Sequence, residues 1–250
     1  MTDAGHKFTH TYFAQYHDCD TRQRLTALAM MRYFEDIALL QSDSYEVGLT
    51  YYATEQVAWL LNKWDIRIQR APVFKDDVHV LTQPMAMRRF LANRRYEISN
   101  EQGEILVEAD SQWVFVDLAR RRPTRIREDI FRTYGITDEV DALPTPPLPR
   151  EPERGDVMRE FHVRKSDIDV NRHVNNIRYV DWALDALPEE IALNATLRRL
   201  LIHYKKEVHY GEEVVARTEM RDEEGLAVAC HGIYVGEELR CALESRWEVE

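Results

Sequence analysis

The sequence contains few of the residues that interrupt or cross-link a chain. Its 250 residues include only 9 glycines and 9 prolines, less than the roughly 12% that these two residue types supply in typical proteins. This usage excludes collagen-like and low-complexity chains. The 3 cysteines, Cys19, Cys230 and Cys241, are odd in number and widely spaced, so they predict reduced thiols instead of a disulfide framework or a zinc knuckle.

Long apolar runs are also missing. The longest are short pieces such as residues 57–61, far below the ~20 residues that cross a bilayer, so we expect no membrane insertion. The first residues have neither the layout of a secretion signal nor the Arg/Ser bias of a transit peptide. We therefore expect a cytoplasmic protein.

Acidic residues outnumber basic residues in this chain. Lys and Arg number 33 against 44 Asp and Glu, a formal net charge of −11, which would repel nucleic acid unless the basic groups were gathered in one patch. The basic groups that do cluster are Arg88, Arg89, Arg94, Arg95, Arg120, Arg121, Arg122, Arg125, Arg127, Lys205 and Lys206. They are interpreted either as charged turns and strand edges or as a docking patch for an acidic partner.

Several catalytic and cofactor-binding motifs are absent. The chain has no GxSxG, GxGxxG or GxxxxGK[ST] segment, which argues against a serine hydrolase elbow and against dinucleotide or P-loop phosphate sites. His203 and His209 would share one face of a predicted strand roughly 20 Å apart, too far for one metal ion. Asp18 and Asp20 would raise the pKa of the Cys19 thiol and make it a poor nucleophile. We expect neither a metal nor a cofactor.

A proline-rich segment divides the chain. Residues 144–152 hold five of the nine prolines, which cannot continue a helix or a central strand. This predicts a stiff linker at 144–153 between an N-terminal module, 1–143, and a C-terminal module, 154–250.

The two modules repeat one plan. A helix is predicted over 26–46 with Gly48 as its C-cap, and a second helix is predicted to end before Pro188. Their apolar stripes are Ala27, Met30, Phe34 and Ile37 in the first helix and Ile177, Val180, Leu184 and Leu187 in the second. The stripes are 150 residues apart (177 − 27), whereas the preceding Asp-x-Asp loops are 149 apart (167 − 18). This spacing predicts a duplicated module whose two loops differ by one residue.

Strand-like segments follow each helix. Alternating apolar and polar residues predict strands at 56–69, 76–84, 86–99 and 104–118, and again at 197–209, 212–220, 226–235 and 239–248. A long helix followed by antiparallel strands, present twice, predicts an α+β fold in which each sheet wraps its helix.

One loop carries groups suited to chemistry. If residues 167–173 are extended, Asp169, Asn171 and His173 share a face with Asp167, directly before a helix capped by Asn175 or Asn176. The N–H groups at a helix N-terminus suit a developing oxyanion. The alternative is that these polar side chains have only a structural role and form hydrogen bonds with the backbone. The first copy, residues 18–25, reads DCDTRQRL and lacks both the amide and the imidazole.

This loop resembles a known family. Residues 169–176 read DVNRHVNN and Tyr179 follows, which is similar to the D-x-N-x-H-V-N-N-x-x-Y signature of acyl-acyl carrier protein thioesterases of the plant FatA/FatB type and their bacterial relatives. Residues 204–207, YKKE, are similar to the family's next motif. Weaker similarities in the first module are the helix at 30–47, the segment 59–68 that begins with Trp59, and the segments MRR at 87–89 and WV at 113–114.

The resemblance implies a tandem hot-dog fold that hydrolyses fatty acyl thioesters on acyl carrier protein. It implies that Glu207 and Asp169 are the carboxylates, with Glu207 as base and Asp169 orienting, and that Asn171 and His173 polarise the carbonyl or pass a proton. A cysteine that often follows the motif glutamate is Val208 here, which excludes a cysteine nucleophile at that position.

The resemblance also implies roles for the two modules. The second would be catalytic, and the first would be non-catalytic and line the acyl chain. The candidates for that lining are Met30, Met31, Phe34, Trp59 and Trp64, each equally explicable as core. The acidic carrier protein would dock on basic groups, for which the candidates are Arg88, Arg89, Arg120, Arg121 and Arg122, with Arg94 and Arg95 beside them.

Three alternatives stay open at this point. The first is an acyl-coenzyme A thioesterase on the same scaffold, and the second is a non-catalytic acyl-binding module. A hydratase fits less well, because the D-x-N-P-x-H arrangement it would need has Arg172 in place of proline. A homodimer is neither predicted nor excluded.

Overall fold

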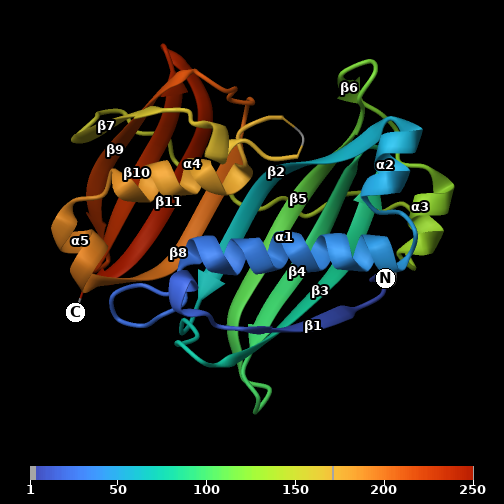
Figure 1. Cartoon of the computed structure of the whole chain (residues 1–250), viewed down its shortest axis with the longest axis horizontal. Coiled ribbons are helices and arrows are strands. Elements are labelled where there is room, and N and C mark those ends of the chain that lie inside the picture. The colour runs from blue at the N-terminus through green and yellow to red at the C-terminus, as the bar shows by residue number, and fades with distance from the viewer. Residues whose placement is uncertain (1–3, 171, 250) are drawn as a thin grey trace. The chain divides into compact units, whose positions relative to one another are not determined.

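The computed structural model describes residues 4–170 and 172–249, which divide into two compact units. The first unit comprises Met1–Asn62 and Gln69–Pro146, and the second comprises Lys63–Ile68 and Pro147–Glu250. Each unit contains a helix against an antiparallel sheet (Figure 1).

The first unit is built on helix α1. Its elements are β1 (Phe8–Phe13), the 3-10 turn η1 (Tyr16–Asp18), α1 (Ala27–Ser44), α2 (Leu49–Glu55), β2 (Val57–Ile68), β3 (Asp77–Arg88), β4 (Leu91–Ser99), β5 (Ile105–Asp117), β6 (Arg122–Pro123) and α3 (Glu128–Thr133). The strand order is β1-β3-β4-β5-β2, with β6 beside β5. The second half of β2 belongs to the second unit, where it pairs with β8.

The second unit repeats the plan around α4. Its elements are β7 (Val157–His162), the 3-10 turn η2 (Lys165–Asp167), α4 (Asn176–Asp185), α5 (Glu189–Asn194), β8 (Ala195–Tyr204), β9 (Glu213–Glu223), β10 (Leu226–Val235) and β11 (Glu238–Val249). The strand order is β8-β11-β10-β9-β7. Helix α4 contacts β7, β9, β10 and β11.

The predicted helices are present, with corrected ends. Thr26 caps α1 by accepting a hydrogen bond from the Ala29 N–H at 3.2 Å, and the stripe residues of α1 are buried. The prediction that Gly48 caps its C-terminus is wrong, because α1 ends at Ser44 and Gly48 is the N-cap of α2. The second helix also ends earlier than predicted, at Asp185, and Pro188 is the N-cap of the short α5.

The strands are largely as predicted, but the predicted ends of β3 and β8 were wrong. The expected break near residue 85 is absent because β3 continues to Arg88 through an irregular pairing between Pro84 and Ala86. The turn lies instead at Arg89, whose φ of +52° supplies the left-handed residue. The strands β1, β6 and β7 and the short helices α2, α3 and α5 were not predicted.

The internal repeat is more regular than the sequence indicated. The starts of β1 and β7, of η1 and η2, and of α1 and α4 are each 149 residues apart (157 − 8, 165 − 16, 176 − 27). The predicted spacing of 150 between the helices, with loops differing by one residue, is therefore wrong. The sheets match as well: Trp113 Nε1 donates to Ser111 Oγ at 2.7 Å, and Trp247 Nε1 donates to Ser245 Oγ at 2.8 Å.

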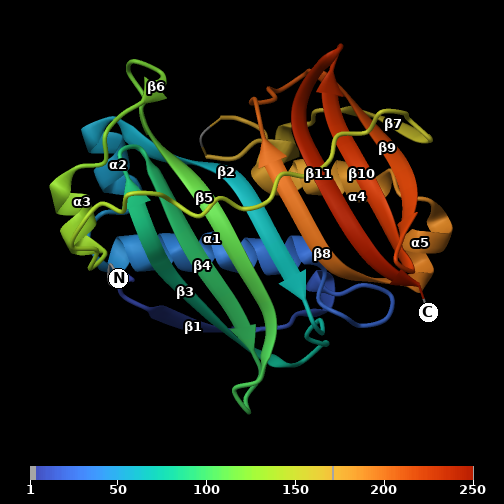
Figure 2. The same ribbon diagram turned by 180° about the vertical axis from the view of Figure 1, so that it is seen from behind.

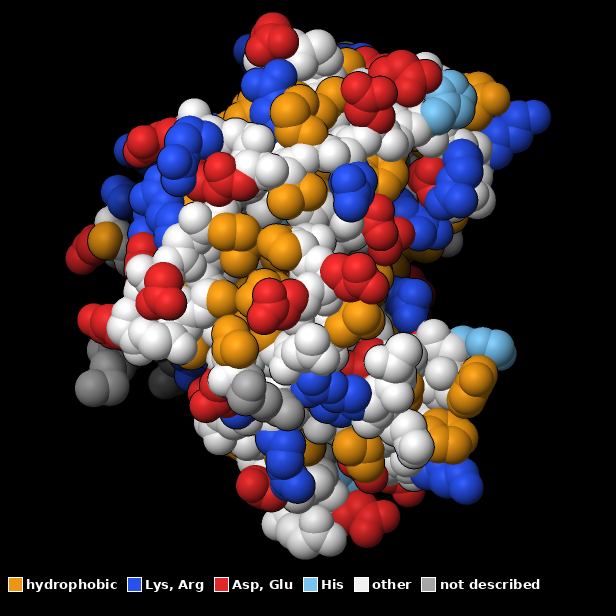
Figure 3. Space-filling view, turned by 90° about the vertical axis from the view of Figure 1, so that its left-hand side faces the viewer, with side chains coloured by type: hydrophobic (Ala, Val, Ile, Leu, Met, Phe, Trp, Pro, Cys, Tyr) orange, Lys and Arg blue, Asp and Glu red, His pale blue; other side chains and the backbone are white. Residues whose placement is uncertain are grey.

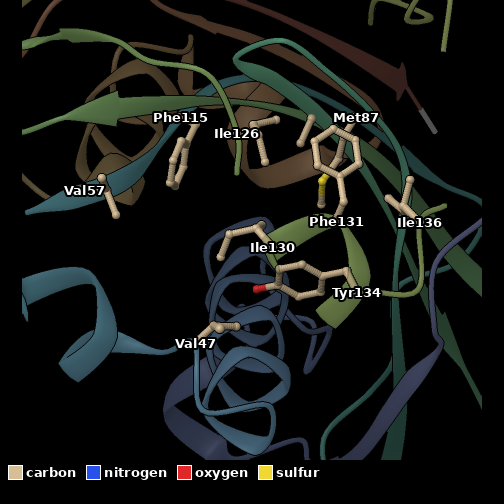
Figure 4. Close-up of a cluster of buried hydrophobic side chains, with 10 residues drawn as sticks. Val47, Val57, Met87, Phe115, Ile126, Ile130, Phe131, Tyr134 and Ile136 are labelled. Carbon is tan, nitrogen blue, oxygen red and sulfur yellow. The ribbon is translucent and has the colours of Figure 1, made fainter. Parts of the chain in front are cut away.

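A buried cluster joins the short helices of the first unit to its sheet. Its members are Val47, Val57, Met87, Ala92, Phe115, Ile126, Ile130, Phe131, Tyr134 and Ile136 (Figure 4). The Tyr134 hydroxyl shares a hydrogen bond of 2.7 Å with Ser42 of α1. The cluster therefore covers apolar surface and also satisfies a buried phenol.

The proline-rich segment belongs to the second unit from Pro147 onward, and this part lies on the second sheet, on the side away from α4 (Figure 2). Arg150 forms ion pairs with Glu223 and, at 2.8 Å, with the buried Glu244. The backbone N–H groups of Glu153 and Arg154 donate to Glu219 at 2.7 and 3.1 Å. Three carboxylates of the sheet thus hold this segment in place.

Arg150→Met should destabilise the protein, because it leaves the buried carboxylate of Glu244 with less compensation. We expect the free energy of unfolding to fall by about 3 kcal/mol in denaturant titrations. Arg132→Met is the matched control, since Arg132 and Glu128 form an exposed i,i+4 pair, and it should change stability by less than about 0.5 kcal/mol. Equal effects of the two substitutions would contradict the assignment.

A histidine is buried in the second sheet. His231 is fully buried and contacts Thr218 Oγ1 at 2.8 Å through Nδ1 and Ser245 Oγ at 2.9 Å through Nε2. Burial lowers the pKa of His231 to about 3. The imidazole therefore stays neutral in the folded protein at pH values where the unfolded chain, with a pKa of about 6.5, takes up a proton.

This difference predicts a loss of stability as the pH falls from about 6.5 toward 3, because only the unfolded chain gains the proton there. His231→Gln should remove up to about 1.4 kcal/mol of that loss per pH unit. The measurement is urea unfolding of both proteins between pH 7 and pH 5, with exposed His17→Gln as the control. Parallel stability curves for His231→Gln and the unsubstituted chain would show the interpretation to be wrong.

Candidate functional site

The segment that carries the motif is a closed turn. The Asp169 N–H donates to the His173 carbonyl at 2.9 Å, and the Arg172 N–H donates to the Asp169 carbonyl at 3.1 Å. Arg172 has a φ of +66°. The expectation of an extended segment with one shared face is therefore wrong, because these bonds bring Asp169 back against Arg172 and His173. Asn171 lies outside the described residues.

Asp167 has a structural role. It is buried in η2, and its carboxylate pairs with Arg164 at 3.0 Å and with Arg178 of α4 at 3.3 Å. Burial would raise the pKa of Asp167, but the hydrogen bonds and charge of Arg164, helped by Arg178, outweigh burial and lower it. The Asp167 carbonyl also accepts from the Asn175 N–H at 2.9 Å, which joins the turn to the start of the helix.

Asn175 is the residue that caps α4. Its side chain accepts a hydrogen bond from the Ile177 N–H at 2.9 Å, and α4 begins at Asn176. The helix N-terminus thus follows His173 by only two residues. Its first N–H groups and its partial positive charge lie immediately after the turn that carries the motif.

Glu207 approaches this turn from another part of the chain. Strand β8 ends at Tyr204, so the prediction of one strand over 197–209, with His203 and His209 on the same face, is wrong. The residues after β8 instead form a loop, which the Val174 N–H joins to the turn by donating to the Val208 carbonyl at 3.0 Å.

The loop and the turn bring a carboxylate to an imidazole. His173 Nε2 lies 3.4 Å from Glu207 Oε2, and the two side chains are 34% and 37% exposed. The His209 ring packs edge-on against the His173 ring, with centroids 5.3 Å apart. His209 was not singled out as a site residue, because the sequence analysis considered it only with His203 as a possible metal ligand. The pair is open to solvent, so water can reach it.

The equivalent positions of the first unit lack this pair. Its turn has the same backbone bonds, from the Asp20 N–H to the Arg24 carbonyl at 2.8 Å and from the Leu25 N–H to the Pro72 carbonyl at 2.7 Å. By these bonds Arg24 matches His173 and Ala71 matches Glu207. Arg24 is bound to Asp20 at 3.0 Å instead.

The residues proposed to line an acyl chain lie in the cores. Met30, Met31 and Phe34 lie on α1 and are buried, with the Phe34 ring 5.0 Å from the Tyr96 ring. Trp59 packs against Phe115 in the first unit. Trp64 is buried too, but it lies on the half of β2 that belongs to the second unit.

Two open grooves lie elsewhere in the described part of the chain. One, of about 420 Å³, lies between β7 and α4 and is lined by Glu160, Phe161, His162, Arg164, Asp181, Trp182 and Asp185. The other, of about 630 Å³, lies in the first unit between the end of α1 and α2. Seen from the side that carries β7, β9 and α5, the surface mixes hydrophobic, acidic and basic side chains (Figure 3). It therefore shows no extended surface of one charge.

Some of the clustered basic residues are exposed at turns, and others are bonded to neighbouring side chains. Arg89 and Arg121 occupy left-handed positions in the turns that follow β3 and β5. Arg120 and Arg121 are exposed in the turn before β6, and Arg122 is exposed at the start of β6. The Arg94 guanidinium donates to Gln41 at 2.5 Å and to Thr82 at 3.0 Å within the first unit. Arg95 is paired with Asp110.

The thiols are not activated. Burial, followed by the charges of Asp18, Asp20 and Asp76, raises the pKa of Cys19. Burial raises the pKa of Cys241 well above its ordinary value and also raises that of Cys230. Over the described ranges, no three His, Cys, Asp or Glu side chains are placed to hold a metal ion. No helix in that part of the chain is long and apolar enough to cross a membrane.

A helix wrapped by an antiparallel sheet, present in two copies, defines a tandem hot-dog protein, as the resemblance implied. Residues 5–134 match the family described as "Acyl-ACP thioesterase N-terminal domain", and residues 150–249 match "Acyl-ACP thioesterase C-terminal domain". The chain therefore belongs to the acyl-ACP thioesterase family.

The individual relatives agree with this assignment. The chain is 30% identical to an acyl-[acyl-carrier-protein] hydrolase of Cuphea viscosissima over 60% of its length, and 26% identical to a palmitoyl-acyl carrier protein thioesterase of Gossypium hirsutum over 81%. Those matches cover 38% and 52% of the relatives' own lengths. The matched part of the chain thus spans about half the length of these two relatives, or less.

Solved structures share the whole fold. A putative oleoyl thioesterase from Lactobacillus plantarum is 27% identical, with a TM-score of 0.94 over 98% of this chain and 97% of that one. The 12:0-ACP thioesterase from Umbellularia californica is 19% identical, with a TM-score of 0.83 over 98% and 94%. The tandem hot-dog fold is confirmed by these neighbours.

Proposed function

We propose that this chain hydrolyses fatty acyl thioesters of acyl carrier protein, releasing the fatty acid and the carrier thiol. The observation that carries the proposal is the pairing of His173 with Glu207 at 3.4 Å in the second unit only. Membership of the acyl-ACP thioesterase family supports it, since relatives are named palmitoyl- and oleoyl-acyl carrier protein thioesterases.

Glu207 is the base in the proposed reaction. It takes a proton from a water molecule whose oxygen attacks the thioester carbonyl, and the carbonyl–sulfur bond breaks as the thiolate leaves. His173 stabilises the charge beside Glu207 and returns the proton to the thiolate. Asn171 polarises the carbonyl, Asp169 orients these groups, and the N-terminus of α4 stabilises the oxyanion.

His173→Ala and Asn171→Ala should each lower kcat by roughly 10²-fold or more while the fold is retained, because each removes a group used in the transition state. The measurement is release of fatty acid from acyl carrier protein, with circular dichroism to check folding. His162→Ala is the control, since His162 pairs with Glu213 outside the site, and it should be fully active. A folded His173→Ala protein with unchanged turnover would remove His173 from the mechanism.

The nearest alternative is an acyl-coenzyme A thioesterase on the same scaffold. The basic turns favour the carrier protein, because a small acidic protein gains from local positive charge on a chain whose net charge is −11. Hydrolysis of one acyl group from both carriers separates these two activities. Absence of turnover on either would leave a non-catalytic acyl-binding module, which the His173–Glu207 pair argues against.

The carrier is proposed to dock on Arg88, Arg89, Arg120, Arg121 and Arg122. The turns that bear these residues are close, since the Ile126 N–H, after β6, donates to the Arg89 carbonyl at 2.7 Å. Several exposed guanidinium groups on neighbouring turns attract an acidic surface and raise the rate of encounter.

Reversing the charge of Arg120, Arg121 and Arg122 to Glu should raise the KM for the acyl carrier substrate roughly tenfold at low salt, and the effect should shrink as salt is added. Hydrolysis of the coenzyme A thioester should change little. A triple Glu variant at Lys7, Arg70 and Lys75, which are exposed in the first unit, controls for net charge. An unchanged KM at low salt would exclude this docking surface.

We also propose that the first unit shelters the acyl chain along α1, where Met30, Met31 and Phe34 supply apolar surface. Residues 1–143, 144–153 and 154–250 remain the proposed acyl-binding module, linker and catalytic module. The free thiols Cys19, Cys230 and Cys241 suit a reducing compartment such as the cytoplasm. Homodimer formation stays open.

A further inference from the structure

The proposed base is carried by a loop and not by a strand. Glu207 follows the end of β8 at Tyr204, and its side chain is 37% exposed. An exposed carboxylate on a loop samples many positions unless its backbone is fixed, and an error of about 1 Å in a catalytic group can cost roughly 10²-fold in rate. The contacts that fix this loop therefore bear directly on the activity.

Arg240 of β11 contacts the loop at several points. Its carbonyl accepts hydrogen bonds from the N–H groups of Lys205 and Lys206 at 2.8 and 3.0 Å. Its Nη1 donates to the Glu207 carbonyl at 3.1 Å, and its Nη2 lies 3.7 Å from the Glu212 carboxylate farther along the loop. One residue thus holds the start, the middle and the end of the segment.

The charge of Arg240 is compensated by groups other than the proposed base. Its side chain is 15% exposed and pairs with Glu238 at 3.3 Å as well as with Glu212. The contact described between Arg240 and Glu207 is with the main-chain carbonyl. The guanidinium therefore fixes the direction of the peptide group at Glu207, which in turn aims the side chain.

Tyr179 of α4 holds the other side of the same loop. Its hydroxyl accepts a hydrogen bond from the Val208 N–H at 2.8 Å and donates to the Lys206 carbonyl at 3.5 Å. Burial raises the pKa of Tyr179, so the hydroxyl stays protonated and keeps both bonds. The peptide groups directly before and after Glu207 are thereby bound to a single phenol.

We propose that Arg240, together with Tyr179, is a positioning residue that holds the Glu207 carboxylate against His173. The inference rests on the proposed function, in which Glu207 is the base. It assigns the two side chains no contact with the substrate. Their effect on turnover must then pass through Glu207, and this separates positioning from a general contribution to stability.

The test is a double-substitution cycle with Arg240→Gln and Glu207→Gln. Arg240→Gln keeps the main-chain carbonyl and removes the guanidinium, and it should lower kcat roughly 10- to 100-fold with little change in KM. In the Glu207→Gln background the same substitution should have no further effect, because the group that it positions is already gone. Arg240→Lys, which keeps the charge, should recover part of the loss.

Arg246→Gln is the matched control. Arg246 lies on the same strand and pairs with Glu244 at 2.9 Å, away from the loop, and its replacement should leave kcat unchanged. If Arg240→Gln fails to fold, Tyr179→Phe tests the same inference, since the ring remains and the two loop bonds are lost. That variant should also lower kcat without an additive effect in the Glu207→Gln background.

The outcomes separate the inference from the proposed function. Full activity of Glu207→Gln would overturn the assignment of the base. Loss of activity in Glu207→Gln with full activity in folded Arg240→Gln and Tyr179→Phe would overturn only the positioning role. Equal fold losses from Arg240→Gln in both backgrounds would also overturn it, because the guanidinium would then act independently of Glu207.

Discussion

One main-chain hydrogen bond makes the candidate site. The Val174 N–H donates to the Val208 carbonyl at 3.0 Å, and it joins the turn before α4 to the loop after β8. His173 precedes the donor by one residue and Glu207 precedes the acceptor by one residue, so their side chains meet once the backbone bond has formed. A buried backbone pair of this kind is costly to break, and it fixes the approach of the two segments.

A comparison of the two units distinguishes the contacts that the fold requires from the side chains that the proposed reaction requires. Both units form the turn through the same backbone bonds, and both place an aspartate at its start, Asp20 and Asp169. In the first unit the positions of the imidazole and the carboxylate hold Arg24 and Ala71. The scaffold therefore tolerates different side chains at these two positions, which is why one copy can carry a site while the other keeps only the framework.

Much of the fold could be predicted from sequence, because local patterns determine it. The stripe of Met30, Phe34 and Ile37 predicted α1, and alternation predicted the long strands. The edge strands β1 and β7 were missed because their exposed positions are mostly polar, and α5 was missed because a helix of six residues leaves little periodicity. The spacing between the two helices was predicted as 150 residues and is 149, because an apolar stripe alone does not fix the register of a helix.

The site was harder to predict than the fold because it depends on where elements end. Alternation from residue 197 onward extended the predicted strand to 209, and on such a strand Glu207 and His209 would have pointed to one solvated face. The strand stops at Tyr204 instead, because the N–H groups of Lys205 and Lys206 both turn to the single carbonyl of Arg240 and cannot continue a ladder in which each N–H has its own partner. That termination releases the next residues into a loop, and the loop lets Glu207 reach His173. The residue that ends the strand is thus also the one whose side chain binds the Glu207 carbonyl, so the geometry of the site and the limit of the sheet have the same physical origin.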